Sequence, residues 1–242
     1  LVMAVFRSDV ILMLGSSGGF VMPFIRLLGK KVIVNVGGVD WKRDKWGPIT
    51  KKIIRCCEYL TIRNASYLVV DNQYIKNLYL DEYSEDSELI AYGGDHAKKI
   101  SASDSLLKEY PFLTNKYCLS VSRAQKDNNI HTLLHAFENI NDINLVVISN
   151  WNSSKYGREL YAEYARLSKN IILIDAIYDQ EILDVIRSNA HLYIHTHSAC
   201  GTAPSLVEAM CLTLPVFCFD CEAIRFSTVE FSKYFSTPEE LT

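Results

Sequence analysis

Short apolar runs alternate with stretches of helical periodicity along most of the chain. The apolar runs have the length of strands and cover residues 9–14, 31–36, 66–71, 87–92, 117–122, 143–149, 170–175, 190–195 and 214–219. Helical periodicity fills residues 23–29, 49–63, 73–83, 131–140, 158–169, 181–188 and 205–212. Continuous apolar strands separated by amphipathic helices indicate parallel sheets covered on both faces. The pattern therefore predicts an α/β chain of the doubly wound type.

The alternation is interrupted once, by the polar stretch of residues 96–116, which contains no strand-like run. We place a domain boundary near residue 113, which gives domains of residues 1–113 and 114–242. About four strands fall in the first domain and about five in the second. A complete mononucleotide-binding half usually begins with a strand, a glycine turn and a helix. We therefore expect the first domain to lack its beginning, and the short tail after the last run indicates that the second lacks its last part.

Composition narrows the class of protein. The 242 residues are 49% hydrophobic and 22% charged, which excludes a disordered chain. A net charge of −3 provides no general attraction to nucleic acid. The longest uncharged run, residues 10–25, is interrupted by three glycines and Pro23. We expect neither a membrane-spanning helix nor a signal peptide.

The cysteines indicate a reducing, cytoplasmic compartment. Seven of them are scattered along the chain, several within apolar runs. Cys218 and Cys221 have the spacing of a redox motif, and His195, His197 and Cys200 could be drawn as a metal site. Neither group has a second half with matching spacing. We therefore expect no metal site.

The segment HTHSACGTAPSLVEAM (residues 195–210) places small residues between a strand-like run and a helix. The amino terminus of a helix presents unpaired N–H groups, and Gly201 lets a ligand approach the backbone. Thr202 and Ser205 add hydroxyl donors, and Glu208 can accept hydrogen bonds from sugar hydroxyls. The turn suits a phosphate beside a ribose. Alternatively, Thr202 or Ser205 only caps the helix and Glu208 faces water.

A second element follows the first strand of the second half. Arg123 comes directly after residues 117–122, and Lys126 is close behind it. The carboxyl ends of parallel strands share one edge of a sheet, so this guanidinium can meet a diphosphate held at the turn. The alternative is an arginine and a lysine on a solvated surface. Two such elements at one edge favour a nucleotide-binding site.

With these motifs, the second half resembles the donor-binding domain of retaining glycosyltransferases of the GT-B fold, family four. More narrowly, the chain is similar to bacterial rhamnosyltransferases of capsule and O-antigen synthesis. The motifs that carry the resemblance are RAQKDNNI (123–130), HSACGTAPSLVEAM (197–210), NVGGVDWKRDKWG (35–47) and YGGD (92–95). The resemblance implies two Rossmann-like domains, the first on the acceptor side and the second binding the nucleotide-sugar.

The resemblance also implies roles for individual residues. The diphosphate would be held by Arg123 with Lys126 or Asn128, the phosphates by Gly201, Thr202 and Ser205, the ribose by Glu208, and the base near Ile177 and Tyr178. Arg123 and Lys126 would act in catalysis by stabilising the charge of the leaving diphosphate. The implied reaction is transfer of L-rhamnose from a dTDP donor, or another sugar from a UDP donor, to a lipid-linked saccharide with retention. It needs no protein nucleophile, no metal and no cofactor.

The sequence departs from the family pattern at three points. Cys200 stands where many relatives have a second glutamate, and Asn128 stands where a lysine is usual. The chain has no histidine before His96, whereas many relatives have one in the first domain. These departures bear on the identity of the sugar and on catalytic competence.

The acceptor side is less defined. Basic residues interleaved with tryptophans fill residues 41–55, and Trp41, Lys42 and Arg43 lead this segment. Such residues suit an anionic membrane surface or a lipid pyrophosphate. The alternative is a solvated helix face with the tryptophans in the core. Asp40 is our candidate for contact with the acceptor hydroxyl, unless it serves as a helix N-cap. We expect a cytoplasmic protein with peripheral contact at the inner face of the plasma membrane.

Two other functions compete with this interpretation. Gly15, Gly18 and Gly19 follow a strand and precede a helix, but the spacing G-x-G-x-x-G of a nicotinamide-dependent dehydrogenase is absent. The more serious alternative is a non-catalytic nucleotide-sugar-binding module, or an inactive fragment of such an enzyme. Binding of a nucleotide without transfer to any acceptor would favour that alternative.

Overall fold

The computed structural model describes residues 7–43, 45–166 and 169–241, and it divides into two compact units. The N-terminal unit contains the described residues up to Tyr92 together with Ala199–Thr202. The C-terminal unit contains Gly93–Ser198 and the described residues from Ala203 onward. None of the helices in these ranges combines the length and the apolar character that crossing a bilayer requires.

The N-terminal unit is built on a four-stranded parallel sheet with the order β1-β2-β3-β4. The strands are β1 (Val10–Leu14), β2 (Lys31–Asn35), β3 (Tyr67–Val70) and β4 (Glu88–Leu89). The helices between them are η1 (Gly19–Val21), α2 (Met22–Leu27), η2 (Asp40–Lys42), α3 (Pro48–Asn64) and α4 (Gln73–Tyr83). Val32, Val34 and Val70 on the sheet are fully buried, and so are Ile75 and Tyr79 of α4, which form the core of this unit.

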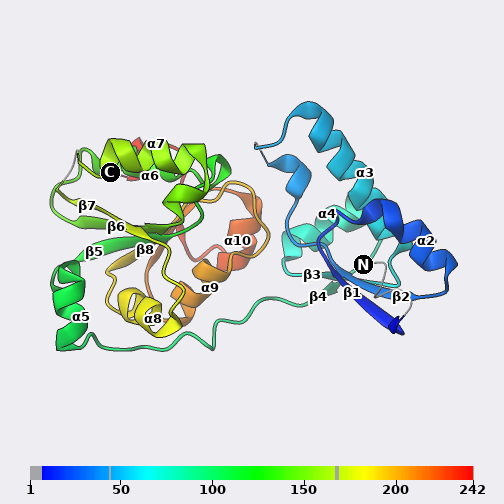
Figure 1. Cartoon of the computed structure of the whole chain (residues 1–242), viewed down its shortest axis with the longest axis horizontal. Helices are drawn as coiled ribbons and strands as arrows, with labels where there is room; N and C mark the ends of the chain where they lie inside the picture. Colours follow the sequence, from blue (N-terminus) through cyan, green and yellow to red (C-terminus); the bar gives the residue numbers. More distant parts are fainter. Residues whose placement is uncertain (1–6, 44, 167–168, 242) are drawn as a thin grey trace. The chain divides into compact units, whose positions relative to one another are not determined.

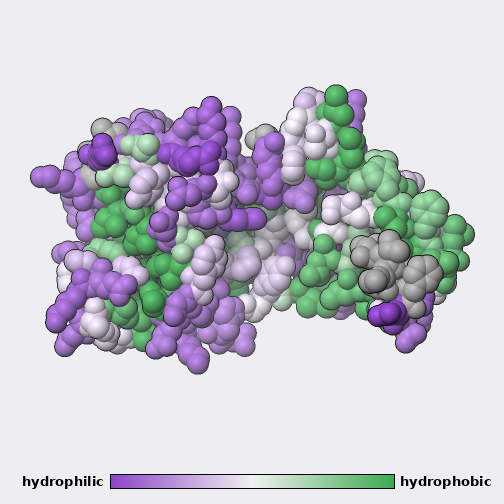
Figure 2. All heavy atoms as spheres, in the orientation of Figure 1, coloured by the Kyte–Doolittle hydropathy of each residue, from purple (hydrophilic) through white to green (hydrophobic). Residues whose placement is uncertain are grey.

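One face of β1 differs from the expectation that both faces of each sheet are covered. Ile11 and Met13 are buried, but Val10, Leu12 and Leu14 are 49%, 64% and 75% exposed. Figure 2 shows hydrophobic residues spread over the part of the N-terminal unit that contains α2. The alternation along β1 is therefore that of a strand covered on one face, in the part of the chain that the structure describes.

The C-terminal unit is built on a six-stranded parallel sheet with the order β10-β9-β8-β5-β6-β7. The strands are β5 (Tyr117–Val121), β6 (Asn144–Ser149), β7 (Ile171–Asp175), β8 (Leu192–His195), β9 (Val216–Phe219) and β10 (Lys233–Phe235). After β7 the chain returns to the other side of β5, so the strand order reverses at β5. This reversal is the topological switch point at which doubly wound folds bind their ligands.

Helices cover both faces of this sheet. They are α5 (Asp104–Glu109), η3 (Pro111–Thr114), η4 (Lys126–Asn128), α6 (Ile130–Phe137), η5 (Trp151–Ser153), α7 (Lys155–Tyr164), α8 (Gln180–Ser188), α9 (Pro204–Cys211), α10 (Glu222–Thr228) and η6 (Glu239–Leu241). In Figure 1, α6 and α7 lie on one side of the sheet, and α8 and α9 lie on the other. The predicted doubly wound architecture is therefore present in this unit.

Two expectations about the limits of the domains differ from the structure. We expected only a short tail after the run at 214–219, but α10 and β10 follow β9, and β10 extends the sheet. We expected the boundary near residue 113, whereas the units divide after Tyr92. Residues beyond that point pack on α8: the amide of Lys98 donates to Asp184 Oδ2 at 3.0 Å, and that of Ile100 to Ser188 Oγ at 3.0 Å.

Candidate active site

A cavity of about 380 Å³ opens at the carboxyl ends of β5, β6 and β7 in the C-terminal unit. Its walls come from the ends of these three strands, from the loop after β8 and from the start of α9. The lining residues are Val121, Ser122, Arg123, Ile148, Ser149, Asn150, Ala176, Ile177, Tyr178, His197, Pro204 and Ser205. The cavity lies next to the switch point of the sheet, where this fold class binds ligands.

The start of α9 brings the backbone N–H of Ser205 to this cavity. Pro204 occupies the first turn of the helix, where its missing donor costs little, and the N-cap residue Ala203 has no side-chain oxygen to bind the Ser205 amide, whereas the amides of Leu206 and Val207 donate to the Ala203 carbonyl. Ser205 follows and lines the cavity with its neighbour Pro204. The amino terminus of α9 therefore keeps its partial positive charge available to a ligand.

Arg123 lies across this cavity on the loop that leaves β5. Its side chain is exposed, and its backbone is held from two sides. Asn128 Nδ2 donates to the Arg123 carbonyl at 2.8 Å, and the amide of Ala124 donates to Asn150 Oδ1 at 2.9 Å. The guanidinium thus projects from a fixed loop. The structure brings Arg123 and Ser205, two of the residues expected at the diphosphate, to one cavity.

Two other residues expected at the diphosphate lie elsewhere. Asn128 is only 2% exposed, and its side-chain amide is engaged by the Arg123 carbonyl. Its own carbonyl accepts from the Thr196 hydroxyl, which ties the loop to the segment after β8. Lys126 is exposed on η4 and is not among the described lining residues. Asn128 is therefore placed to hold Arg123.

The loop after β7 lines the cavity as the sequence suggested. Ile177 and Tyr178 both contribute to its wall, and Tyr178 is 90% exposed. Ser122, which follows β5, and Ser149, which ends β6, were not picked out from the sequence. Their hydroxyl oxygens are buried and have no hydrogen-bond partner in the described part of the chain. A serine that follows an apolar strand gives little sign of this role, because the same residue often only ends a strand.

Glu208 on α9 is nearly buried and holds two partners within the same unit. Its carboxylate accepts from the guanidinium of Arg187, and Oε1 lies 2.8 Å from His96 Nε2. Arg187 is 2% exposed and also lies 3.7 Å from Asp184 Oδ1. The alternative in which Glu208 faces water is therefore wrong. Neither Arg187 nor His96 was picked out from the sequence.

Gly201 and Thr202 belong to the segment Ala199–Thr202, which groups with the N-terminal unit. Within that unit the Thr202 hydroxyl donates to the carbonyl of Asp71 at 2.6 Å. This hydroxyl has therefore a protein partner, and Thr202 does not cap α9, whose N-cap is Ala203. Contacts of Gly201 and Thr202 with phosphate stay a prediction.

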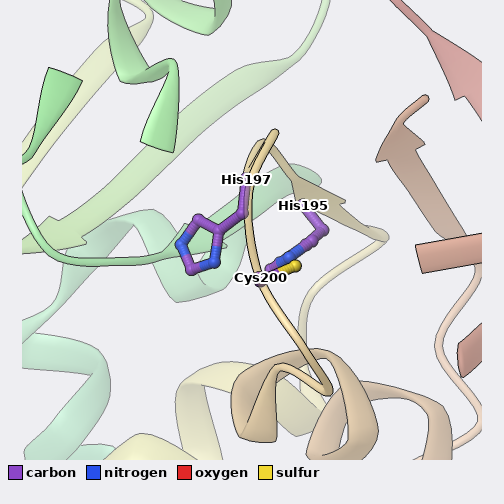
Figure 3. Close-up of side chains that lie close together, drawn as sticks. All are labelled: His195, His197 and Cys200. Atoms are coloured by element: carbon purple, nitrogen blue, oxygen red, sulfur yellow. The ribbon is translucent and has the colours of Figure 1, made fainter. Parts of the chain in front are cut away.

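The possible metal ligands gather at the end of β8 and in the segment that follows it. Figure 3 shows the side chains of His195, His197 and Cys200 side by side, and their ligand atoms lie within 4.8 Å of one another. Burial lowers the pKa of His195 well below its ordinary value, so this imidazole is neutral, and its Nε2 has no hydrogen-bond partner among the described residues. A neutral imidazole is the form that ligates a metal. The expectation of no metal stays a prediction.

The residues expected on the acceptor side lie together in the N-terminal unit. Trp41 and Lys42 are in η2, and Arg43 follows with its guanidinium 3.4 Å from Asp40 Oδ1. Asp40 caps no part of α3, which begins at Pro48 with Gly47 as its N-cap. Trp41 Nε1 donates to Glu58 Oε1 at 3.0 Å, so this tryptophan is held against α3.

The family follows from the sequence of the C-terminal unit. Residues 104–232, more than half of the chain, match the model described as glycosyl transferases group 1. The chain belongs to the group 1 glycosyl transferases. In this group 1 glycosyl transferase, residues 5–95 match a second model, described as a domain of unknown function, DUF1972. No curated protein matches the sequence.

Solved structures share the fold of this group 1 glycosyl transferase at low sequence identity. Anabaena HepE in complex with UDP and glucose has a TM-score of 0.78 at 16% identity, over 99% of this chain and 68% of that one. Sucrose-phosphate synthase from Thermosynechococcus elongatus has a TM-score of 0.77 at 17% identity, and the match covers 98% of this chain and 63% of that one. The trehalose 6-phosphate synthase from Burkholderia multivorans has a TM-score of 0.71 at 11% identity, and the match covers 97% of this chain and 61% of that one. The predicted GT-B fold, with two parallel-sheet α/β units, is confirmed.

Proposed function

We propose that this glycosyltransferase moves a hexosyl or deoxyhexosyl group from a nucleotide-sugar to a lipid-linked saccharide in bacterial surface polysaccharide synthesis, with retention. The first candidate for the donor is dTDP-L-rhamnose, and a UDP-sugar is the second. One observation carries the proposal: Arg123 and the amino terminus of α9 line the same cavity at the switch point of the C-terminal sheet.

The donor diphosphate lies between Arg123 and the Ser205 amide at the start of α9. A guanidinium binds phosphate oxygens bidentately, and the helix terminus adds N–H donors. Ser205 and the unpartnered hydroxyls of Ser122 and Ser149 supply further donors. Lys126 adds positive charge from the same loop as Arg123. Gly201 and Thr202 approach the phosphates from the segment before α9.

The nucleoside lies toward the loop after β7 and toward α9. Tyr178 offers a large exposed ring to the base, and Ile177 adds an apolar wall. Glu208 binds the ribose hydroxyls with the lone pairs that Arg187 and His96 leave unused, because each carboxylate oxygen has two. The related fold of HepE, solved with UDP-glucose, supports a nucleotide-sugar as the class of donor.

Transfer depends on stabilising the leaving diphosphate. As the glycosidic bond breaks, negative charge develops on the phosphate oxygens, and in this proposal Arg123 and the Ser205 amide stabilise it directly while Lys126 adds positive charge from the neighbouring loop. None of the described residues that line the cavity is Asp or Glu. This favours a front-face route with retention over a double displacement, which uses a carboxylate nucleophile. The route needs no metal and no cofactor.

The acceptor is bound by the N-terminal unit in this proposal. Asp40 contacts the acceptor hydroxyl, and Trp41, Lys42 and Arg43 face the lipid-linked substrate. The half-exposed carboxylate of Asp40 supports this role. The protein then works in the cytoplasm, in peripheral contact with the inner face of the plasma membrane.

A thermal-shift panel of dTDP-, UDP- and GDP-sugars tests the donor site. A ligand that binds only the folded state raises the unfolding midpoint, by an amount that grows with its concentration over Kd. We expect a dTDP- or UDP-sugar to raise it. Arg123→Ala should remove the shift and lower transfer by about 10²–10³-fold, as loss of one stabilising donor does elsewhere. Arg158→Ala, at an exposed arginine of α7, is the matched control.

Product analysis separates the proposal from its alternative. Formation of an α- or β-linked product with the anomeric configuration of the donor, read by NMR, supports retention. A chain that binds the nucleotide but forms no product with any lipid-linked acceptor is a binding module or an inactive fragment. A chain with Arg123→Ala that turns over like the wild type contradicts the proposed site.

A further inference from the structure

A second cavity, of about 480 Å³, lies in the N-terminal unit and is almost entirely cationic. It is lined by Trp41, Lys42, Lys51, Lys52 and Arg55. Trp41 and Lys42 come from η2, and the other three come from the first turns of α3. None of the described lining residues is acidic. A hollow with four cations and one aromatic ring has the composition of an anion-binding site.

The aromatic wall of this cavity is fixed by contacts within the unit. Trp41 Nε1 donates to Glu58 Oε1 at 3.0 Å, and Tyr83 donates to the same oxygen at 2.9 Å. The Arg55 guanidinium lies 4.6 Å from the centroid of the Trp41 ring, and Lys42 Nζ lies 5.4 Å from it. Cation–π contacts of this kind hold the charged groups near the ring. The cations are therefore arranged before a ligand arrives.

The positive charge of the cavity is only partly neutralised. Arg55 pairs with Glu82 at 2.7 Å, whereas Lys42 donates to the uncharged hydroxyl of Tyr74 at 2.7 Å. No ion pair joins Lys52 to a carboxylate in the part of the chain that the structure describes. Glu58, the buried carboxyl behind Trp41, has a pKa that burial raises. Excess positive charge faces the hollow.

We propose that this cavity binds a phosphate-bearing group, either a phosphate monoester or a diphosphate. Lysine ammonium groups bind phosphate as point charges, and Arg55 adds a planar fork of donors. The site is separate from the donor cavity, because its five lining residues all belong to the N-terminal unit.

The exposed neighbours of the cavity favour a lipid-borne phosphate. Ile49 and Ile53 of α3 are 76% and 49% exposed, and they lie one turn apart on the helix face that also carries Lys52. Apolar residues beside lysines on one helix face suit the boundary between headgroups and acyl chains. The choice of a lipid-borne phosphate rests on the proposed function, in which the acceptor is lipid-linked. The phosphate site itself does not depend on that function.

Calorimetric titration with inorganic pyrophosphate tests the site. The full chain is used with Arg123→Ala, so that the donor cavity does not take up the probe. We expect saturable binding that Lys51→Gln with Lys52→Gln weakens about tenfold. Lys98→Gln with Lys99→Gln removes the same charge from an adjacent pair of exposed lysines in the C-terminal unit and should leave the affinity unchanged. No binding, or equal binding by both double variants, overturns the proposal.

Vesicle flotation distinguishes the sources of the phosphate. We expect the chain to float with phosphatidylcholine vesicles that contain phosphatidic acid and not with pure phosphatidylcholine. Ile49→Ser with Ile53→Ser should abolish flotation and leave pyrophosphate binding unchanged. Pyrophosphate binding without flotation overturns the lipid-borne source and assigns a soluble one.

The proposed function is tested separately by the same variants. Lys51→Gln with Lys52→Gln, with Arg123 intact, should retain the thermal shift that the donor nucleotide produces. If the donor nucleotide raises the unfolding midpoint but pyrophosphate does not bind, the phosphate site in the N-terminal unit is wrong and the donor site stands. If pyrophosphate binds but no nucleotide-sugar raises the unfolding midpoint, the result contradicts the proposed function and leaves the phosphate site intact.

Discussion

His96 Nε2 lies 2.8 Å from Oε1 of Glu208, although the two residues are 112 positions apart in the sequence. The guanidinium of Arg187 binds the same carboxylate through Oε2. Because a carboxylate can only accept, Nε2 of His96 carries the hydrogen in this contact. Both oxygens of Glu208 are thereby anchored, and the orientation of the carboxylate is fixed.

If Glu208 binds ribose, loss of His96 should weaken nucleotide binding. A hydrogen bond to a charged group contributes about 1.5–3 kcal/mol, so His96→Ala should raise the Kd for UDP or dTDP about tenfold in calorimetry. His96→Gln keeps an N–H donor and should restore most of the affinity. His191→Ala, at an exposed histidine before β8, serves as the control. Wild-type affinity in His96→Ala would show that this anchor is dispensable.

Arg187 should contribute mainly to folding. It is 2% exposed and pairs with Glu208 and Asp184, so Arg187→Ala leaves two carboxylates without their cation. Breaking a buried pair from one side costs about 3–5 kcal/mol of stability. Urea unfolding should show this loss. Arg225→Ala, which removes a partly exposed arginine paired with Asp220 and Glu230, should cost less, because solvent screens these pairs. Equal losses in the two variants would contradict the prediction.

Glu58 should make stability depend on pH. Burial raises its pKa in the folded state, so at pH values between the unfolded and the folded pKa the folded chain binds more protons than the unfolded chain. Stability should therefore be fully present below about pH 4.3, the pKa of a free glutamate, and should fall as pH rises through the folded pKa, by up to about 1.4 kcal/mol per pH unit. Urea unfolding of Glu58→Gln from pH 5 to pH 8 should lack this loss. The same substitution at the exposed Glu181 should keep the wild-type profile.

Chelation tests the prediction that no metal is needed. Protein dialysed against EDTA should bind the donor nucleotide with unchanged affinity, because phosphate contacts come from Arg123 and from backbone amides in the proposed site. EDTA would remove an ion held by His195, His197 and Cys200, whose ligand atoms lie close enough together to bind one. If EDTA lowers affinity, Zn²⁺ restores it, and Cys200→Ser prevents the restoration, then the cluster holds a functional metal.

Regular elements could be predicted because each depends on a local pattern. The apolar runs that indicated β5, β6 and β7 became buried strands, and the turn before α9 was visible from Gly201 and Pro204. β10 was missed because residues 233–235 are short and flanked by polar residues. Its pairing with β9 is a tertiary contact that no local period reveals.

The site was predictable only where residues follow strand ends. Arg123 and Tyr178 lie two and three residues after the ends of β5 and β7, so their place at one edge followed from the parallel sheet. Asn128 shares the motif of Arg123, but its side-chain amide turns inward and donates to the Arg123 carbonyl. Arg187 lies inside the amphipathic pattern of α8, where a charged residue is usually a surface residue. Only packing against α9 reveals its partner.

The apolar side chains of Val10, Leu12 and Leu14 affect how the isolated chain will behave in solution. β1 is an edge strand in the described sheet. One side of its backbone therefore has no neighbouring strand to pair with among the described residues, and its exposed leucine side chains lie beside that edge. Such a surface attracts copies of itself, and light scattering should increase steeply with protein concentration. Substituting Leu12 by lysine should suppress that self-association, because its side chain points away from the buried core.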